Sequence, residues 1–118
     1  PQNVILTDYL NHTVFMKLMS LCDVVLALTG RQDTVLWSIR EIMALGKPFI
    51  TTDSEVLRHY FDKVAVFTNH TPFDIKIKIA EAIQNKDIIT EKINNFLVQD
   101  KIRWDKDIEK IRTLIENS

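Results

Sequence analysis

The chain has 118 residues, of which 46% are hydrophobic, and a formal net charge of −1; this is the size of a single domain. The balanced charge offers no basic stripe, so we expect no nucleic acid as the main partner. The lone cysteine, Cys22, excludes a disulfide framework, and no apolar run reaches the ~18 residues needed to span a bilayer.

Strands and helices are predicted to alternate in residues 1–70. Short apolar runs predict strands at residues 4–6, 24–28, 49–51 and 64–67, and apolar residues at helical spacing predict helices at 12–22, 34–45 and 54–61. The run Val24–Leu28 is continuously apolar, which is typical of a strand buried on both faces. Gly46 directly follows the second helix, in the position of a C-cap.

Only helices are predicted after this point, at residues 72–84, 87–98 and 106–115. The order β-α-β-α-β-α-β, followed by C-terminal helices, predicts an α/β fold with a Rossmann-like parallel sheet flanked by helices. We treat residues 1–118 as one domain, with an α/β core at 1–70 and a helical C-terminal part at 71–118. Ligands of such sheets bind outside the carboxyl ends of the strands. The loops of interest are therefore 7–11, 29–34, 51–55 and 68–73.

The loop from Thr29 to Thr34 leaves a buried strand and enters a helix, which makes it the first candidate for a binding site. Backbone N–H groups at a helix start attract anions, and the helix dipole adds to this attraction. Gly30 and Arg31 lie in this loop, and Arg31 offers a counter-charge with fork geometry. A diphosphate is the ligand that we expect for such a loop.

Glu41 is an acid on the helix that follows. It shares roughly one helix face with Thr34, Trp37 and Ser38, and side chains on that face lean back toward the loop. A carboxylate would repel a diphosphate, but it suits the vicinal hydroxyls of a ribose. From spacing alone a plainer interpretation stays open, in which Asp33 or Thr34 is the helix N-cap and Glu41 is a solvated position.

A sequence resemblance covers nearly the whole chain. Residues 41–50 read E-I-M-A-L-G-K-P-F-I and resemble the signature E-A-M-A-x-G-K-P-V-[IV] of retaining GT-B glycosyltransferases. Residues 3–10 resemble the family's N-V-x-F-x-G-Y-L, and residues 18–28 its helix-strand unit Y-x-x-A-D-V-x-V-x-P. Residues 51–58 and Trp104 resemble further parts of the family. The resemblance implies the C-terminal domain of such an enzyme, which binds the nucleotide-sugar donor.

The family carries an E-x7-E motif, which reads D-x7-E here, from Asp33 to Glu41. By resemblance, Asp33 contacts hydroxyls of the transferred sugar and Glu41 binds the ribose, and these two are the expected catalytic residues. The family's G-F-G after the first acid is replaced by Thr34, Val35 and Leu36. We expect Thr34 and Val35 to present backbone N–H groups to phosphate.

Further donor contacts follow from the same resemblance. Tyr9 and Leu10 match the loop that meets the nucleotide base. Gly30 and Arg31, together with Ser38 on the helix face of the second acid, complete the expected nucleotide-sugar site. The expected ligand is a nucleotide sugar, which is a substrate, and no separate cofactor or metal is expected.

The implied reaction is transfer of a hexose from a nucleoside diphosphate to an acceptor hydroxyl. Its main catalytic contribution would be stabilisation of the leaving diphosphate by backbone N–H groups, the helix dipole and Arg31. The family's N-terminal acceptor domain has no counterpart in the chain, so we expect a part of a longer two-domain enzyme that is inactive alone. The expected location is the cytoplasm, with peripheral contact at the inner face of the membrane, through the parent protein, as an alternative.

Two other functions stay open. The first is a GT-B-like module that has lost catalysis and binds or assembles with a partner, which the replaced glycines favour. The second is a sugar-nucleotide epimerase of the same fold. A receiver domain of the response-regulator type is not favoured, because the acids of this chain do not follow that layout.

Several polar and aromatic residues have ordinary structural interpretations. The histidines His12, His59 and His70 lack the spacing of metal ligands. Asp53 and Ser54 follow a predicted strand, where they either cap the next helix or touch the donor.

Overall fold

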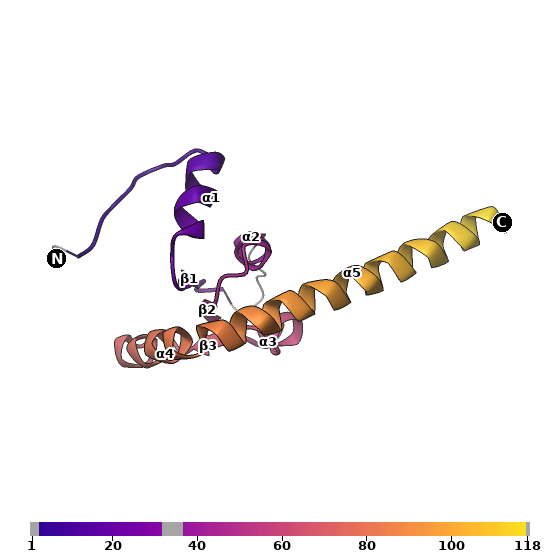
Figure 1. The fold of residues 1–118 in the computed structure, drawn as a ribbon. Coiled ribbons are helices and arrows are strands. Elements are labelled where there is room, and N and C mark those ends of the chain that lie inside the picture. The colour runs from indigo at the N-terminus through magenta and orange to yellow at the C-terminus, as the bar shows by residue number, and fades with distance from the viewer. Residues whose placement is uncertain (1–2, 32–36, 118) are drawn as a thin grey trace.

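The computed structural model describes residues 3–31 and 37–117 of the chain. Within these ranges helices and strands follow one another as Figure 1 shows. Their bounds are α1 His12–Ser20, β1 Val25–Ala27, α2 Trp37–Ala44, β2 Phe49–Thr52, α3 Glu55–Phe61, β3 Val66–Thr68, α4 Pro72–Gln84 and α5 Lys86–Glu116. This alternation up to β3, followed by helices, confirms the α/β class predicted from the sequence.

Strands β1, β2 and β3 form one parallel sheet in that order. Val25 of β1 lies opposite Phe49 of β2, and Ile50 of β2 lies opposite Val66 of β3. The central strand β2 is buried at all four positions, as expected of a parallel strand that is covered on both faces. Because the strands are parallel, their carboxyl ends share one edge of the sheet.

The core lies between the central strand and the helices around it. Helix α2 buries the apolar residues of one helical face, Ile39, Ile42 and Met43. Helix α5 contributes the fully buried Ile93, and Phe61 of α3 meets Phe49 edge to face with ring centroids 6.3 Å apart. Each such side chain stabilises the fold by about 1.5–3 kcal/mol relative to exposure. These contacts hold α2, α3 and the first half of α5 around the sheet.

The helix ends follow their local sequence. Asn11, Ser54 and Thr71 each accept a backbone N–H with the side chain, as N-caps of α1, α3 and α4. Gly46 follows α2 with a φ of 69°, a left-handed conformation that glycine adopts without steric cost. Two backbone hydrogen bonds of 2.9 and 3.2 Å close this turn, so the predicted glycine C-cap is confirmed.

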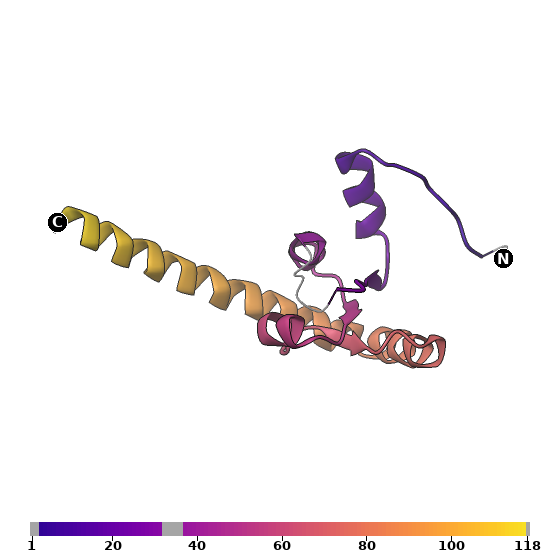
Figure 2. The same ribbon diagram turned by 180° about the vertical axis from the view of Figure 1, so that it is seen from behind.

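The strand predicted at residues 4–6 is wrong. Within the described residues this segment has no strand pairing, and its side chains are between 56% and 89% exposed. Figures 1 and 2 show it extending away from the sheet. A three-residue strand satisfies its backbone and buries its side chains only beside another strand, and the described part of the chain supplies no such partner for it. The sheet described here therefore has three strands and not the four predicted.

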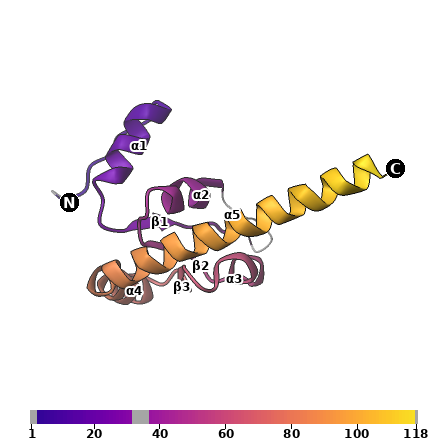
Figure 3. The ribbon, with the colours of Figure 1, turned by 45° about the vertical axis from the view of Figure 1, so that its right-hand side comes forward.

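The two C-terminal helices predicted at residues 87–98 and 106–115 are instead one helix, α5. No glycine or proline interrupts its sequence, and Arg103 donates to Asp100 at 2.8 Å across the predicted break. All residues from 101 to 117 are exposed. Figure 3 shows this half projecting from the body of the protein, whose longest extent is 63 Å against 30 and 29 Å.

Candidate functional site

A polar cavity lies at the carboxyl edge of the sheet. Its volume is about 310 Å³, and the segments that end or follow β1, β2 and β3 line it. The lining residues are Thr29, Gly30, Thr52, Asp53, Thr68, Asn69 and His70. Three of the loops expected at the ligand edge thus meet in one place, because parallel strands end on the same side.

Thr52 joins the ends of the three strands. Its hydroxyl accepts the backbone N–H of Thr29 at 2.8 Å and donates to the carbonyl of Thr29 at 3.0 Å. The same oxygen lies 2.8 Å from Nε2 of His70. A hydroxyl has one proton and two lone pairs, so all three contacts are satisfied when Nε2 of His70 carries a proton and donates it. The His70 ring is thereby fastened to the end of β2.

The backbone of His70 is held as well. Its φ is 74°, which is uncommon outside glycine, and its N–H donates to the hydroxyl of Thr68 at 3.2 Å. Thr68 in turn donates to the carboxylate of Asp74 at 2.8 Å, which also accepts the N–H of Asn69 at 3.1 Å. The hydrogen bond from Thr68 and then that from Asn69 lower the pKa of Asp74. An ionised Asp74 therefore holds the loop that carries His70.

Asp53 is an acidic member of the cavity lining. Arg58 of α3 donates to both of its carboxylate oxygens, at 2.5 and 3.1 Å. This hydrogen bonding is the largest cause that lowers the pKa of Asp53. The guanidinium also lies 4.4 Å from the centroid of the Phe67 ring. Asp53 consequently presents a carboxylate whose charge is balanced, so it repels an anion in the cavity less than a lone acid would.

Gly30 and Arg31, predicted to bind the donor, lie in the loop that borders this cavity. Gly30 lines it, and no described atom beyond its chain neighbours lies within 4 Å of the position that a Cβ would take. Arg31 is exposed, and its N–H donates at 3.2 Å to the hydroxyl two residues earlier. Asp33, Thr34 and Val35 lie outside the described residues. The role of Asp33 as the first acid of the motif, and that of Thr34 and Val35 as phosphate-binding backbone, remain predictions.

Glu41, the second acid, faces helix α1. Its Oε2 lies 3.9 Å from Nδ1 of His12, the first residue of α1, and the two side chains are 39% and 74% exposed. His12 follows closely on Tyr9, which is exposed, and Leu10, which is half-buried. The acid assigned to the ribose therefore contacts the first residue of α1, which follows two residues after the segment assigned to the base.

Ser38, the other predicted donor contact on α2, also faces α1. It is half-buried and lines a mostly apolar cavity of about 350 Å³ between α1 and β1. Phe15, Met19 and Ile42 are among its neighbours there. The structure thus brings Ser38 and Glu41 to one side of α2, as their spacing predicts, but surrounds Ser38 with apolar side chains.

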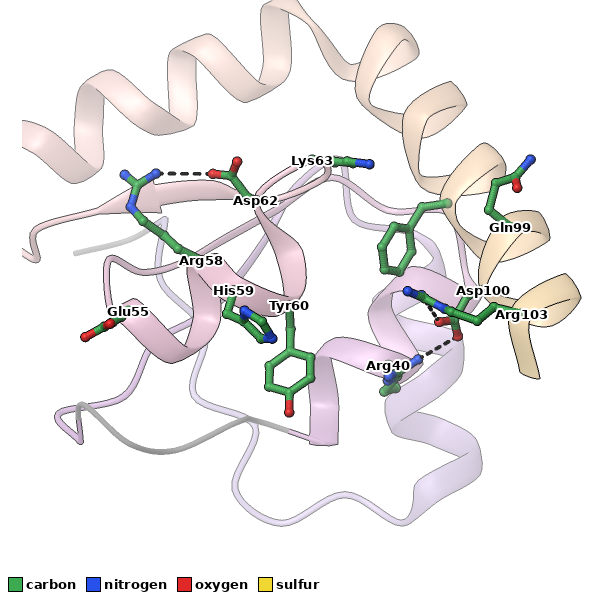
Figure 4. A pocket seen from close by; sticks show the side chains of 11 residues that line it. Arg40, Glu55, Arg58, His59, Tyr60, Asp62, Lys63, Gln99, Asp100 and Arg103 are labelled. Carbon is green, nitrogen blue, oxygen red and sulfur yellow. Dashed lines mark hydrogen bonds and ion pairs between the residues drawn. The ribbon is translucent and has the colours of Figure 1, made fainter. Parts of the chain in front are cut away.

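A second polar hollow, of about 1120 Å³, opens between α2, α3 and α5 (Figure 4). Across it Arg40 of α2 donates to Asp100 of α5 at 3.2 Å, and Arg103 donates to the same carboxylate at 2.8 Å. Burial opposes ionisation of Asp100, but the hydrogen bonds from Arg103 and Arg40 outweigh it and lower the pKa. These charges are already paired with one another, so they tie α5 to α2.

Thr52 and His70 were not among the residues predicted for the site. Their loops were expected at the ligand edge, and this was the signal that the sequence offered. The hydrogen bond between them joins positions 18 residues apart and depends on how β2 and β3 pair. Local sequence patterns do not reveal such a contact.

Within residues 3–31 and 37–117, no group of three or more His, Cys, Asp or Glu residues could hold a metal ion. In the same part of the chain, no helix has both the length and the hydropathy to cross a membrane. No known protein family, curated protein or solved structure matches this chain.

Proposed function

We propose that the chain is the donor-binding part of a retaining glycosyltransferase of the GT-B type. It would bind a nucleoside-diphosphate sugar for transfer of the sugar to an acceptor hydroxyl. The observation that carries this proposal is the contact between Glu41 and His12. It supports the proposal because His12, which the acid assigned to the ribose contacts, follows two residues after Leu10, at the end of the segment assigned to the base. The signature from Glu41 to Ile50 supports the same assignment, since it spans the second half of α2, its glycine cap and the start of β2.

The phosphate end of the ligand is assigned to the carboxyl edge of the sheet. Thr29 and Gly30 line the polar cavity there, at the start of the loop that leads into α2. Hydroxyl, amide and backbone N–H groups of such a lining suit phosphate oxygens. In this assignment the nucleoside lies against Glu41, and the diphosphate lies at the end of β1.

The chemistry required of this part is stabilisation of charge. As the bond between the sugar and the diphosphate breaks, negative charge grows on the departing phosphate oxygen. Donors fixed around that oxygen, with Arg31 as a cation, stabilise the transition state more than the ground state. Glu41 holds the ribose hydroxyls and so positions the nucleotide without taking part in the bond change.

Isothermal titration calorimetry of the 118-residue chain with UDP, GDP, ADP, CDP and dTDP tests the proposal. We expect one of these nucleotides to bind, and to bind more tightly than its own nucleoside, which lacks the phosphates. A chain that is folded by circular dichroism yet gives no binding heat with any of the five would overturn the donor-binding role.

A non-catalytic assembly module is the second candidate, and one observation favours it. The projecting half of α5 carries exposed apolar side chains, among them Trp104, Ile108 and Ile111, and exposed apolar patches are typical of protein contacts. The resemblance offers another use for this surface, because the last helix of the family packs across the other domain. Absence of nucleotide binding would favour the assembly module.

A further inference from the structure

His70 is an imidazole held in place at the carboxyl edge, and none of the donor contacts assigned so far involves it. We propose that Nδ1 of His70 binds a phosphate oxygen of the donor's diphosphate, in the cavity that it shares with Thr29 and Gly30. This inference rests on the proposed function, because it adds a binding residue to the same donor site.

The hydrogen bonds of the ring select which nitrogen is available. Nε2 is engaged by the hydroxyl of Thr52 at 2.8 Å, and this bond is best satisfied with a proton on Nε2. No hydrogen bond to Nδ1 is found among the described residues. In the protonated ring both nitrogens donate. Nδ1–H can then bond a phosphate oxygen while Nε2–H keeps the contact with Thr52.

The surroundings of the ring suit an anion. Asp53 and Asp74 are the nearby acids, and both are already engaged, Asp53 by Arg58 and Asp74 by Thr68 and the N–H of Asn69. Arg31 lies in the loop after β1, where its backbone N–H donates to the hydroxyl of Thr29. The charge of Asp53 is balanced by Arg58, whereas Asp74 is a carboxylate whose oxygen is engaged by hydrogen bonds from β3 and the loop after it.

The size of the cavity indicates which part of the donor it takes. About 310 Å³ is at the small end of the range for ligand sites, which suits a diphosphate better than a whole nucleotide sugar. Because the ring is tied to β2 and its backbone to β3, it would meet the diphosphate without a prior rearrangement, and such preorganisation favours binding.

The substitution His70→Gln distinguishes the role of Nδ1 from that of Nε2. The glutamine amide can still donate to Thr52, as Nε2 does, but it offers nothing in place of Nδ1. His59→Gln is the matched control, because His59 lies on α3 and lines the other polar hollow. Thr52→Val is a second variant, since it keeps the imidazole and removes the hydroxyl that positions it. Circular dichroism and thermal unfolding check that each variant is folded.

The probes are inorganic pyrophosphate, UDP and GDP, titrated by calorimetry at about pH 6.5, where an ordinary histidine is partly protonated. The ¹⁵N resonances of the histidine rings are followed by NMR in the same samples. We expect the diphosphate to shift Nδ1 of His70 and not the ring of His59. We expect His70→Gln to weaken diphosphate binding about tenfold, because a charge-assisted hydrogen bond is lost. Thr52→Val should also weaken binding, because the ring is no longer held in place, whereas His59→Gln should leave it unchanged.

The outcomes separate this inference from the proposed function. A nucleoside diphosphate that binds wild type and His70→Gln equally, without shifting His70, overturns the inference and leaves the donor site standing. If pyrophosphate shifts the Nδ1 resonance of His70 but UDP and GDP bind no more tightly than pyrophosphate, His70 is confirmed as an anion contact. The same result counts against the donor-binding function. If neither pyrophosphate nor any of the five nucleoside diphosphates binds, both proposals fall.

Discussion

Glu41 on α2 and His12 at the start of α1 face each other, with 3.9 Å between Oε2 and Nδ1. Asn11 fixes where α1 begins, because its side chain accepts the N–H of Val14 at 2.9 Å. The cap and the contact together place the start of α1 beside α2, whereas the segment that precedes α1 extends away from the sheet (Figures 1 and 2). Both partners are exposed, so this ion pair, present when His12 is protonated, adds little to stability. Substitution of Glu41 should therefore leave the fold intact.

Replacement of Glu41 tests the assignment of the ribose acid. Glu41→Ala should weaken binding of the matching nucleoside diphosphate about tenfold or more, because hydrogen bonds to a charged group are lost, while the melting temperature stays nearly unchanged. Calorimetric titration measures the affinity, and Glu91→Ala, an exposed acid on α5, is the matched control. In a complete two-domain enzyme the same substitution should abolish transfer. Equal affinities for Glu41→Ala and wild type would remove the ribose role.

Gly46→Ala should lower the free energy of unfolding by about 1–2 kcal/mol, because alanine is strained in the left-handed conformation that ends α2. An added Cβ would meet Thr90 and Asn94 only at 3.6 and 3.7 Å, which are ordinary contacts, so the cost lies in the backbone. Urea denaturation measures it. Gly30→Ala is the control, with an expected change below about 0.5 kcal/mol, since Gly30 is not left-handed and no described atom crowds it. Equal losses in the two variants would contradict a conformational cause.

Asp74, which holds the loop between β3 and α4, should make the stability of the protein depend on pH. The hydrogen bonds from Thr68 and Asn69 lower the pKa of Asp74 in the folded protein. The folded state therefore favours the carboxylate, and the stabilisation is complete above the pKa of an unfolded aspartate, about 4. It is lost as the pH falls through the lowered pKa of the folded state.

Asp74→Asn should therefore be less stable than wild type at pH 6, and the two should converge as the pH falls below about 4. Urea denaturation at a series of pH values measures the difference. Asp105→Asn, on the projecting half of α5, is the matched control and should run parallel to wild type. A difference between Asp74→Asn and wild type that does not change with pH would show that the charge of Asp74 is not the cause.

The elements that the sequence predicts well are those whose signals are local. Helix α4 is found at residues 72–84 as predicted, because Thr71 caps it, Pro72 begins it and apolar residues recur at helical spacing. The end of α2 is predicted equally well, because Gly46 is a local signal for a helix C-cap. Residues 4–6 have the composition of a strand, but a strand forms only beside another, and composition does not reveal whether that partner is present.

The site is predictable to the level of loops and no further. Parallel strands place the loops that contain Gly30, Asp53 and His70 on one edge, and this follows from the alternation of elements. The bond between His70 and Thr52 depends on strand pairing and on a left-handed residue that is not glycine. Asp33, the first acid of the motif, lies outside the described residues, so its role rests on the resemblance alone.

Two isoleucines on α5 distinguish its buried half from its projecting half. Ile93 is fully buried in the core, whereas Ile108 is 39% exposed. Ile93→Ala should cost about 2–5 kcal/mol, because it leaves a cavity. Ile108→Ala should cost less than about 1 kcal/mol, since alanine also favours the helix. Urea denaturation measures both, and light scattering under the same conditions gives the mass. If Ile108→Ala costs as much as Ile93→Ala, the projecting half is packed in solution. A doubled mass would then identify a second copy as the molecule that covers it, because no other protein is in the sample.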